Sequence, residues 1–250
     1  MFTPSERADL LDALVAAARD DPRIDGAALA GSSARGFTDE WSDIDLALSV
    51  AADHDAVVED WTSRLYQSHA AITHLDMWAG GTLFRVFLLP GTLQLDVAFW
   101  PSARFGATGP NFKVLFGTAA SKEHNAPPSA SSLIGMGWLY ALHARSSIAR
   151  GRVWQAEYMI SGMRDQVLVL ACLRHGVPAV QGRGIDELPA SSTEPVAAGL
   201  VRSLDAAELR RAFAATAAAF ADEAARHDPE LAARLVDPLH ELVATAGHPG

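Results

Sequence analysis

Apolar residues in the first hundred positions follow helical spacing at first and strand spacing afterwards. A cap, a proline and an acidic residue at Thr3-Pro4-Ser5-Glu6 predict a helix start, and apolar side chains then recur three and four apart as far as Ala18. Short apolar runs bounded by glycine, proline or polar residues predict five strands, with one further helix after the second. The strands are expected at residues 24–30, 44–50, 72–78, 83–89 and 93–100, and the helix at 57–66.

The pattern changes in the second half of the chain. Residues 101–128 are rich in Pro, Gly, Ser and Ala, which indicates a domain boundary or a substrate-facing loop, with an apolar island at residues 112–116. Helical spacing then predicts helices at 132–149, 152–175, 205–226 and 229–246, and prolines other than Pro238 fall between these segments or at their starts. We therefore expect an α+β chain: a mixed sheet with helices over residues 1–120 and an all-helical bundle over residues 121–250.

Composition narrows the class of protein. The 250 residues are 49% hydrophobic, which is enough for a packed core, and carry a net charge of -10, which argues against a nucleic-acid partner. The acidity fits a cationic partner, carboxylates around metal ions, or simple solubility. The single cysteine, Cys172, excludes an intramolecular disulfide, and we see neither a secretory signal nor an apolar run of about 20 residues. We expect a cytoplasmic protein with no membrane partner, as a monomer or homodimer.

The first chemical signal is Gly31-Ser32-Ser33, directly after the first predicted strand. Glycine lets the backbone approach a ligand closely, and the two serines offer hydroxyl and backbone donors. A strand end followed by a Gly-Ser turn and a helical turn is suited to binding a phosphate. No Gly-Lys-Ser/Thr follows, so this is not a Walker loop.

The second signal is a set of aspartates. Asp43 and Asp45 lie two apart at the start of a strand, so they project from one face about 7 Å apart at their Cα atoms. Asp96 lies inside a later apolar strand, where an unpaired carboxylate would be costly. Carboxylates together with a triphosphate are the oxygen ligands that magnesium prefers.

These two signals in this order resemble the DNA polymerase β nucleotidyltransferase superfamily. The string GSSARGFTDEWSDIDLAL over residues 31–48 is similar to the minimal and antibiotic nucleotidyltransferase branches. The general resemblance covers about the first hundred residues, and the helical half resembles more loosely the C-terminal domain of aminoglycoside and lincosamide nucleotidyltransferases. It implies a polymerase β-like N-terminal domain and Mg²⁺-dependent transfer of AMP from ATP to a small-molecule hydroxyl, as in antibiotic resistance.

The resemblance also implies a role for each residue. Asp43 and Asp45 would hold two Mg²⁺ ions, and Asp96 would complete the acceptor-side metal site or take the proton. Gly31, Ser32 and Ser33 would hold the β- and γ-phosphates of the triphosphate. Arg35 would add positive charge there, or would instead point to solvent and pair with Asp39 or Glu40.

Two further residues are candidates from the second half and the junction. In the resembling aminoglycoside enzymes a glutamate of the helical domain serves as the acceptor's base, and Glu157 is the candidate here; the alternative is a surface glutamate. It belongs to a polar and aromatic stripe with Trp154 and Tyr158, which is unusual for a core-facing helix. Lys113, one of only two lysines, is a candidate contact for the triphosphate or acceptor, or an exposed loop lysine.

Other functions remain open at the level of the sequence. The main alternative is a minimal nucleotidyltransferase joined to a HEPN-like helical domain, acting in a toxin–antitoxin pair or as a protein-AMPylating module. Such helical RNases use an arginine and a histidine a few residues apart; Arg234 and His240 have loosely similar spacing, but Pro238 between them argues against one continuous helix. A nucleic-acid nucleotidyltransferase is disfavoured by the negative net charge.

Overall fold

The computed structural model describes residues 3–31, 34, 39, 41–107, 111–121 and 127–247. The chain divides into two compact units, residues 1–125 and 126–250, which are described separately. The first holds a six-stranded mixed sheet with helices and the second is helical, so the α+β class expected from the sequence is confirmed.

The sheet of the first unit has the strand order β3-β4-β5-β2-β1-β7. Strands β3, β4 and β5 form an antiparallel meander, whereas β5 runs parallel to β2. The apolar island, expected inside a loop, forms the edge strand β7 beside β1. The strands are β1 (Ile24–Ala30), β2 (Ile44–Val50), β3 (Thr73–Ala79), β4 (Thr82–Leu88), β5 (Gln94–Pro101) and β7 (Phe112–Phe116).

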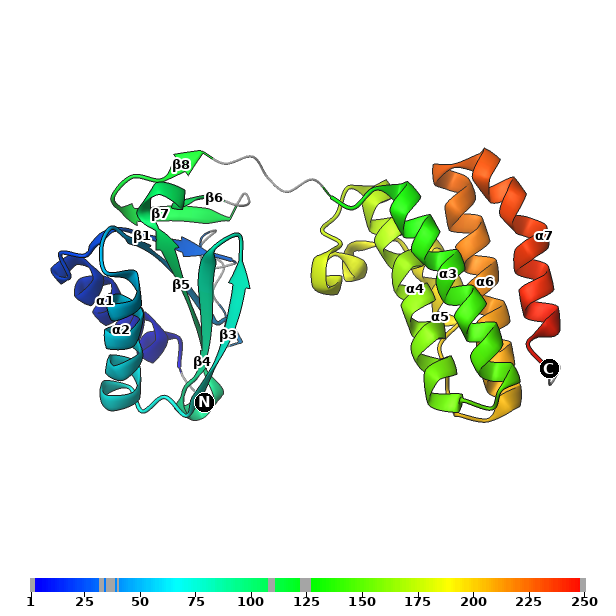
Figure 1. Cartoon of the computed structure of the whole chain (residues 1–250), viewed down its shortest axis with the longest axis horizontal. Coiled ribbons are helices and arrows are strands. Elements are labelled where there is room, and N and C mark those ends of the chain that lie inside the picture. The colour runs from blue at the N-terminus through cyan, green and yellow to red at the C-terminus, as the bar shows by residue number, and fades with distance from the viewer. Residues whose placement is uncertain are drawn as a thin grey trace. The chain divides into compact units, whose positions relative to one another are not determined.

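One face of this sheet is covered by α1 (Pro4–Asp20) and α2 (His54–Ser68) (Figure 1). Helix α1 begins with the expected capping box, in which Thr3 Oγ1 accepts from the Glu6 backbone amide and Glu6 accepts from the Thr3 amide. Alternate residues of the central strands bury their side chains beneath the helices. The main contributors from the strands are Leu46, Leu48, Leu95, Val97 and Phe99, and those from the helices are Leu10, Leu14, Trp61 and Leu65.

The opposite face of the sheet is covered only in part. Alanines in the middle of the central strands, Ala28, Ala47 and Ala98, pack with Trp100 and Phe105. Phe105 lies next to the short two-stranded sheet formed by β6 (Gly106–Ala107) and β8 (Ala120–Ser121). Short 3₁₀ turns are found at Pro90–Thr92, Ser102–Arg104, Val180–Gly182 and Ile185–Glu187.

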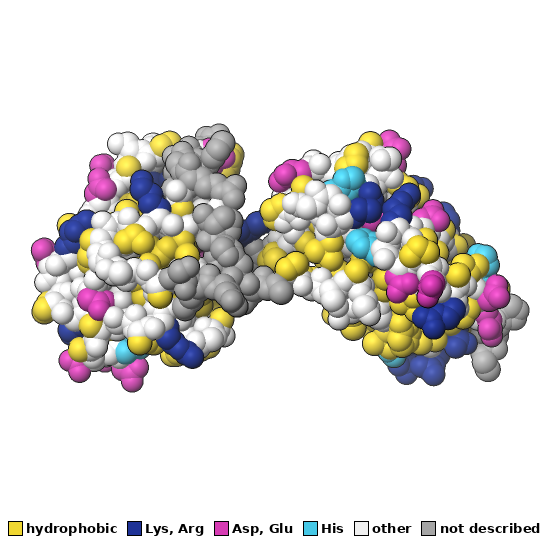
Figure 2. All heavy atoms as spheres, turned by 90° about the horizontal axis from the view of Figure 1, so that it is seen from above, with side chains coloured by type: hydrophobic (Ala, Val, Ile, Leu, Met, Phe, Trp, Pro, Cys, Tyr) yellow, Lys and Arg dark blue, Asp and Glu magenta, His cyan; other side chains and the backbone are white. Residues whose placement is uncertain are grey.

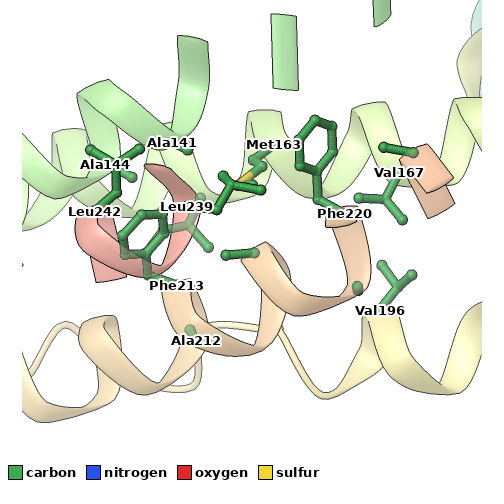
Figure 3. Packing of buried hydrophobic residues seen from close by; sticks show 14 of the residues in the cluster. Ala141, Ala144, Met163, Val167, Val196, Ala212, Phe213, Phe220, Leu239 and Leu242 are labelled. Atoms are coloured by element: carbon green, nitrogen blue, oxygen red, sulfur yellow. The ribbon is translucent and has the colours of Figure 1, made fainter. Parts of the chain in front are cut away.

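The second unit is a bundle in which apolar faces of several helices meet (Figures 1 and 3). Phe213 and Phe220 of one helix point into the centre, where they meet Met163 and Leu239 from two others (Figure 3). Gly137 permits this packing, because a Cβ at that position would overlap the Phe220 ring. The helices are α3 (Ala130–Ala149), α4 (Val153–His175), α5 (Ala190–Ala197), α6 (Ala206–His227) and α7 (Pro229–Thr245).

Two expectations for the bundle are corrected. The short helix α5 had no counterpart in the periodicity analysis, since its eight residues are too few for a clear pattern. Helix α7 runs unbroken through Pro238, so the proline does not separate Arg234 from His240. Residues six apart in one helix still lie about 120° apart around its axis, so the two side chains do not share a face.

The surfaces of both units mix charged and hydrophobic side chains (Figure 2). None of the helices in the described part of the chain is both long and apolar enough to cross a membrane.

Candidate active site

Asp45 and Asp96 lie side by side on neighbouring parallel strands. The register of β2 and β5 pairs Asp45 with Asp96, and the preceding pair is Ile44 with Leu95. Ile44 and Leu95 are buried on the helix-covered face, so both carboxylates project from the opposite face. Both aspartates are half-buried. Two acids distant in the sequence are therefore neighbours at one end of the sheet.

Gly31 contacts this acidic pair from the end of β1. Its φ of +62° is in the left-handed region, and a Cβ built on it would overlap Asp45 Oδ2 and lie 3.0 Å from Asp45 Cγ. Position 31 therefore requires glycine both for its backbone conformation and for space. The Gly31 backbone and the Asp45 carboxylate are in direct contact, as a shared ligand site would require.

The surroundings of Asp96 in this site raise its pKa. Burial raises the pKa of Asp96, a hydrogen bond from Gln94 lowers it, and the nearby charge of Asp43 raises it again, leaving the pKa above its usual value. Gln94 Nε2 donates to Asp96 Oδ1 at 2.9 Å. Asp43, the third acid, directly precedes Ile44, the first residue of β2, two residues before Asp45.

Asp43 follows a turn that is fixed by a buried arginine, a feature the sequence analysis missed. Arg7 of α1 is 5% exposed and its Nη1 donates to the Ser42 carbonyl at 3.0 Å. Its Nη2 donates to the Asp39 carbonyl, while Ser42 Oγ donates to Asp39 Oδ1 at 2.8 Å. The Asp39-x-x-Ser42 spacing is a turn signal in the sequence, but nothing there connects it to Arg7.

The structure does not bring Lys113 to the acids. Lys113 pairs with Leu29 on β1, and Leu29 pairs with Leu46 of the helix-covered core. The lysine is therefore on the face opposite Asp45 and Asp96. The other predicted phosphate contacts, Ser32, Ser33 and Arg35, lie outside the described residues.

Glu157 belongs to the helical unit, near the start of α4. It is half-buried, and Ser161 Oγ donates to its Oε1 at 2.6 Å. The neighbouring aromatics Trp154 and Tyr158 are 74% and 65% exposed, so the polar and aromatic stripe is a surface of this unit and not part of its core.

The acids of the first unit have the chemistry of a divalent-cation site. Among the described residues, no three histidine, cysteine, aspartate or glutamate side chains converge closely enough to enclose a metal ion. Asp45 and Asp96 are nevertheless neighbours in register, and the charge of Asp43 disfavours the ionised form of Asp96, which a cation would stabilise. Mg²⁺ usually binds one or two carboxylates together with substrate phosphates. Carboxylates fit this ligand set here, because the absence of a side chain at Gly31 lets the backbone lie against Asp45.

Comparisons with known proteins give a limited likeness. No protein-family model matches the chain, and no curated protein matches it. The crystal structure of an aminoglycoside 6-adenyltransferase from Bacillus subtilis is similar over 97% of this chain and 99% of that chain, with 14% sequence identity and a TM-score of 0.41. The assignment of the acidic pair therefore depends on its own geometry.

Proposed function

We propose that this protein transfers a nucleoside monophosphate, AMP from ATP, to a hydroxyl of a small molecule and releases pyrophosphate. The observation that carries the proposal is the in-register pair Asp45 and Asp96 with the backbone of Gly31 against Asp45. Such a site offers carboxylates for divalent cations directly beside a turn whose sequence suits phosphate binding.

The reaction makes one bond and breaks one. The acceptor oxygen bonds to the α-phosphorus, the bond from that phosphorus to the bridging oxygen breaks, and pyrophosphate leaves with the electron pair. Mg²⁺ held by Asp43, Asp45 and Asp96 would neutralise phosphate charge and lower the pKa of the attacking hydroxyl. The segment Gly31-Ser32-Ser33 would hold the β- and γ-phosphates, and Arg35 would add positive charge.

The hydroxyl proton needs an acceptor, and we propose two candidates. Asp96 is the first candidate, because its carboxylate stands beside Asp45 in the register of β2 and β5. Glu157, the candidate implied by family resemblance, is supported by its half-buried carboxylate. Replacing Glu157 by Gln and measuring the pH dependence of kcat separates the two candidates. If Glu157 is the base, the variant should no longer show the fall of kcat at low pH that protonation of the base causes.

The proposal is tested by incubating the full chain with Mg²⁺, α-labelled ATP and a panel of hydroxyl acceptors. Label should move to an acceptor with equimolar pyrophosphate, and Asp45→Asn should abolish the transfer. Asp55→Asn is the control, because Asp55 is a fully exposed acid of the same unit. Intact ATP binding without any transfer by the wild type would contradict the proposed function.

A further inference from the structure

The acidic pair continues across the sheet into an apolar surface. Asp96 pairs with Val86 of β4, and Val86 pairs with Leu75 of β3. Asp45, Asp96, Val86 and Leu75 thus form one row on one face. Neighbouring strands lie about 4.8 Å apart, so this row extends about 10 Å beyond Asp96.

The side chains on this part of the face form what we call the apolar strip, made of Leu75, Met77, Phe84, Val86 and Leu88. Register places them on the side of the sheet that carries Asp96, since Met77 pairs with Phe84 and Leu88 with Gln94. Leu75, Met77 and Leu88 are 60%, 48% and 40% exposed. Exposed apolar side chains that lie next to one another mark a binding site more often than scattered ones do.

The apolar strip carries no charged side chain, although β3 and β4 contain charged residues. Asp76 and Arg85 pair with each other through two bonds of 2.6 Å, and alternation places them on the opposite face. A polycation would find no carboxylate on the strip beyond the acids of the proposed metal site. The surface is complementary to a neutral, apolar group.

We propose that the apolar strip binds the acceptor, and that the acceptor is a neutral hydroxyl compound with an apolar body. This inference rests on the proposed function. In the proposed function the triphosphate lies on the Gly31 side of the acidic pair, so the acceptor would approach across Asp96. Its hydroxyl lies at the carboxylates, where the oxygen bonds to the α-phosphorus as pyrophosphate leaves and the proton passes to a carboxylate. Its apolar body extends over Val86 towards Leu75.

The length of the acceptor's apolar part is the variable to test. Probes are n-alkyl β-glucosides from methyl to hexyl, which share the same hydroxyls, with an aminoglycoside as the polycationic comparison. Each added methylene should lower KM about three- to fourfold, as long as it is buried on the strip. Leu75→Thr should remove much of this dependence. Trp78→Thr is the matched control, because Trp78 is 65% exposed on the opposite face of the same strand.

A footprint measures binding without relying on transfer. Hexyl glucoside with Mg²⁺ and a non-hydrolysable ATP analogue should slow oxidation of Met77 several-fold, while methyl glucoside should not. Met136 of α3 is the internal control, because it is similarly exposed at 42%. Protection of Met77 without transfer would support the strip and count against the proposed function. Transfer that ignores chain length, prefers the aminoglycoside or leaves Met77 unprotected would overturn the inference and leave the proposed function standing.

Discussion

The carboxylate of Asp45 lies against the Cα of Gly31, at a distance that leaves no room for a side chain on residue 31. This contact joins the end of β1 to the start of β2, where Asp45 stands beside Asp96. The end of β1, whose sequence suits phosphate binding, is therefore in direct contact with the acidic pair.

Replacing Gly31 by alanine should lower activity at least tenfold. The new Cβ would displace the Asp45 carboxylate, and the left-handed backbone would cost about 1 kcal/mol in addition. Gly80→Ala separates the two effects, because Gly80 has a φ of +56° and open space around it. Steady-state kinetics and thermal unfolding of both variants check this; equal losses of activity would contradict a specific role for the Gly31 contact.

Replacing Asp96 by asparagine should lower activity at least about 100-fold, because a metal site is worth several kcal/mol of transition-state stabilisation. Stability should be unchanged or higher, since asparagine removes the repulsion from Asp43 and still bonds to Gln94. Transfer kinetics beside a urea titration measure both quantities. A variant that unfolds more easily, with activity reduced only in proportion, would instead give Asp96 a structural role.

Arg7→Ala should reduce kcat/KM about tenfold by loosening the turn before Asp43. It should also destabilise the fold by about 2 kcal/mol, because it removes two hydrogen bonds from a buried, charged guanidinium to backbone carbonyls. Arg19→Ala is the control: Arg19 is also on α1 and also donates to a carbonyl, that of Leu115, but it is exposed and distant from the acids. Kinetics are compared at a temperature where all variants are folded, and partial rescue by Arg7→Lys is expected.

Glu223 should stabilise the helical unit in a pH-dependent way. It is 2% exposed and accepts from Arg174 at 2.8 and 2.9 Å. Burial alone would raise the pKa of Glu223, but the bonds from Arg174 and Arg226 outweigh it and the pKa lies below its usual value. Its contribution is therefore complete above about pH 5 and is lost as pH falls through the lowered pKa.

Glu223→Gln should cost about 3 kcal/mol at pH 7, and the difference from wild type should shrink in acid. Denaturant unfolding between pH 7 and pH 3 measures this. Glu208→Gln, which breaks the more exposed pair with Arg211, should have a smaller effect at pH 7. A Glu223→Gln difference that stays constant with pH would contradict the assignment.

The sequence predicted most elements because their patterns are local. The capping box at Thr3 and the alternation in residues 44–50 are set by neighbouring residues, and both are present in the structure. The edge strand β7 was missed because its pairing with β1 is a long-range interaction. Pro238 lies inside α7 although proline is disfavoured in the interior of a helix.

The candidate site was predictable in its residue types and less so in its arrangement. Asp45 and Asp96 could be chosen from the sequence, because a carboxylate in an apolar strand is costly to bury unless it has a partner or a metal ion. Their register, the support from Arg7 and the position of Lys113 on the opposite face depend on strand order, which the sequence pattern does not specify.

The most direct test of the central claim is transfer of label from α-labelled ATP by the wild-type chain, Asp45→Asn and Asp55→Asn, with Mg²⁺ and with EDTA. We expect labelled acceptor and equimolar pyrophosphate from the wild type and from Asp55→Asn with Mg²⁺, and none from Asp45→Asn or with EDTA. Transfer that survives Asp45→Asn, or a wild type that binds ATP and transfers nothing to any acceptor, would contradict the account.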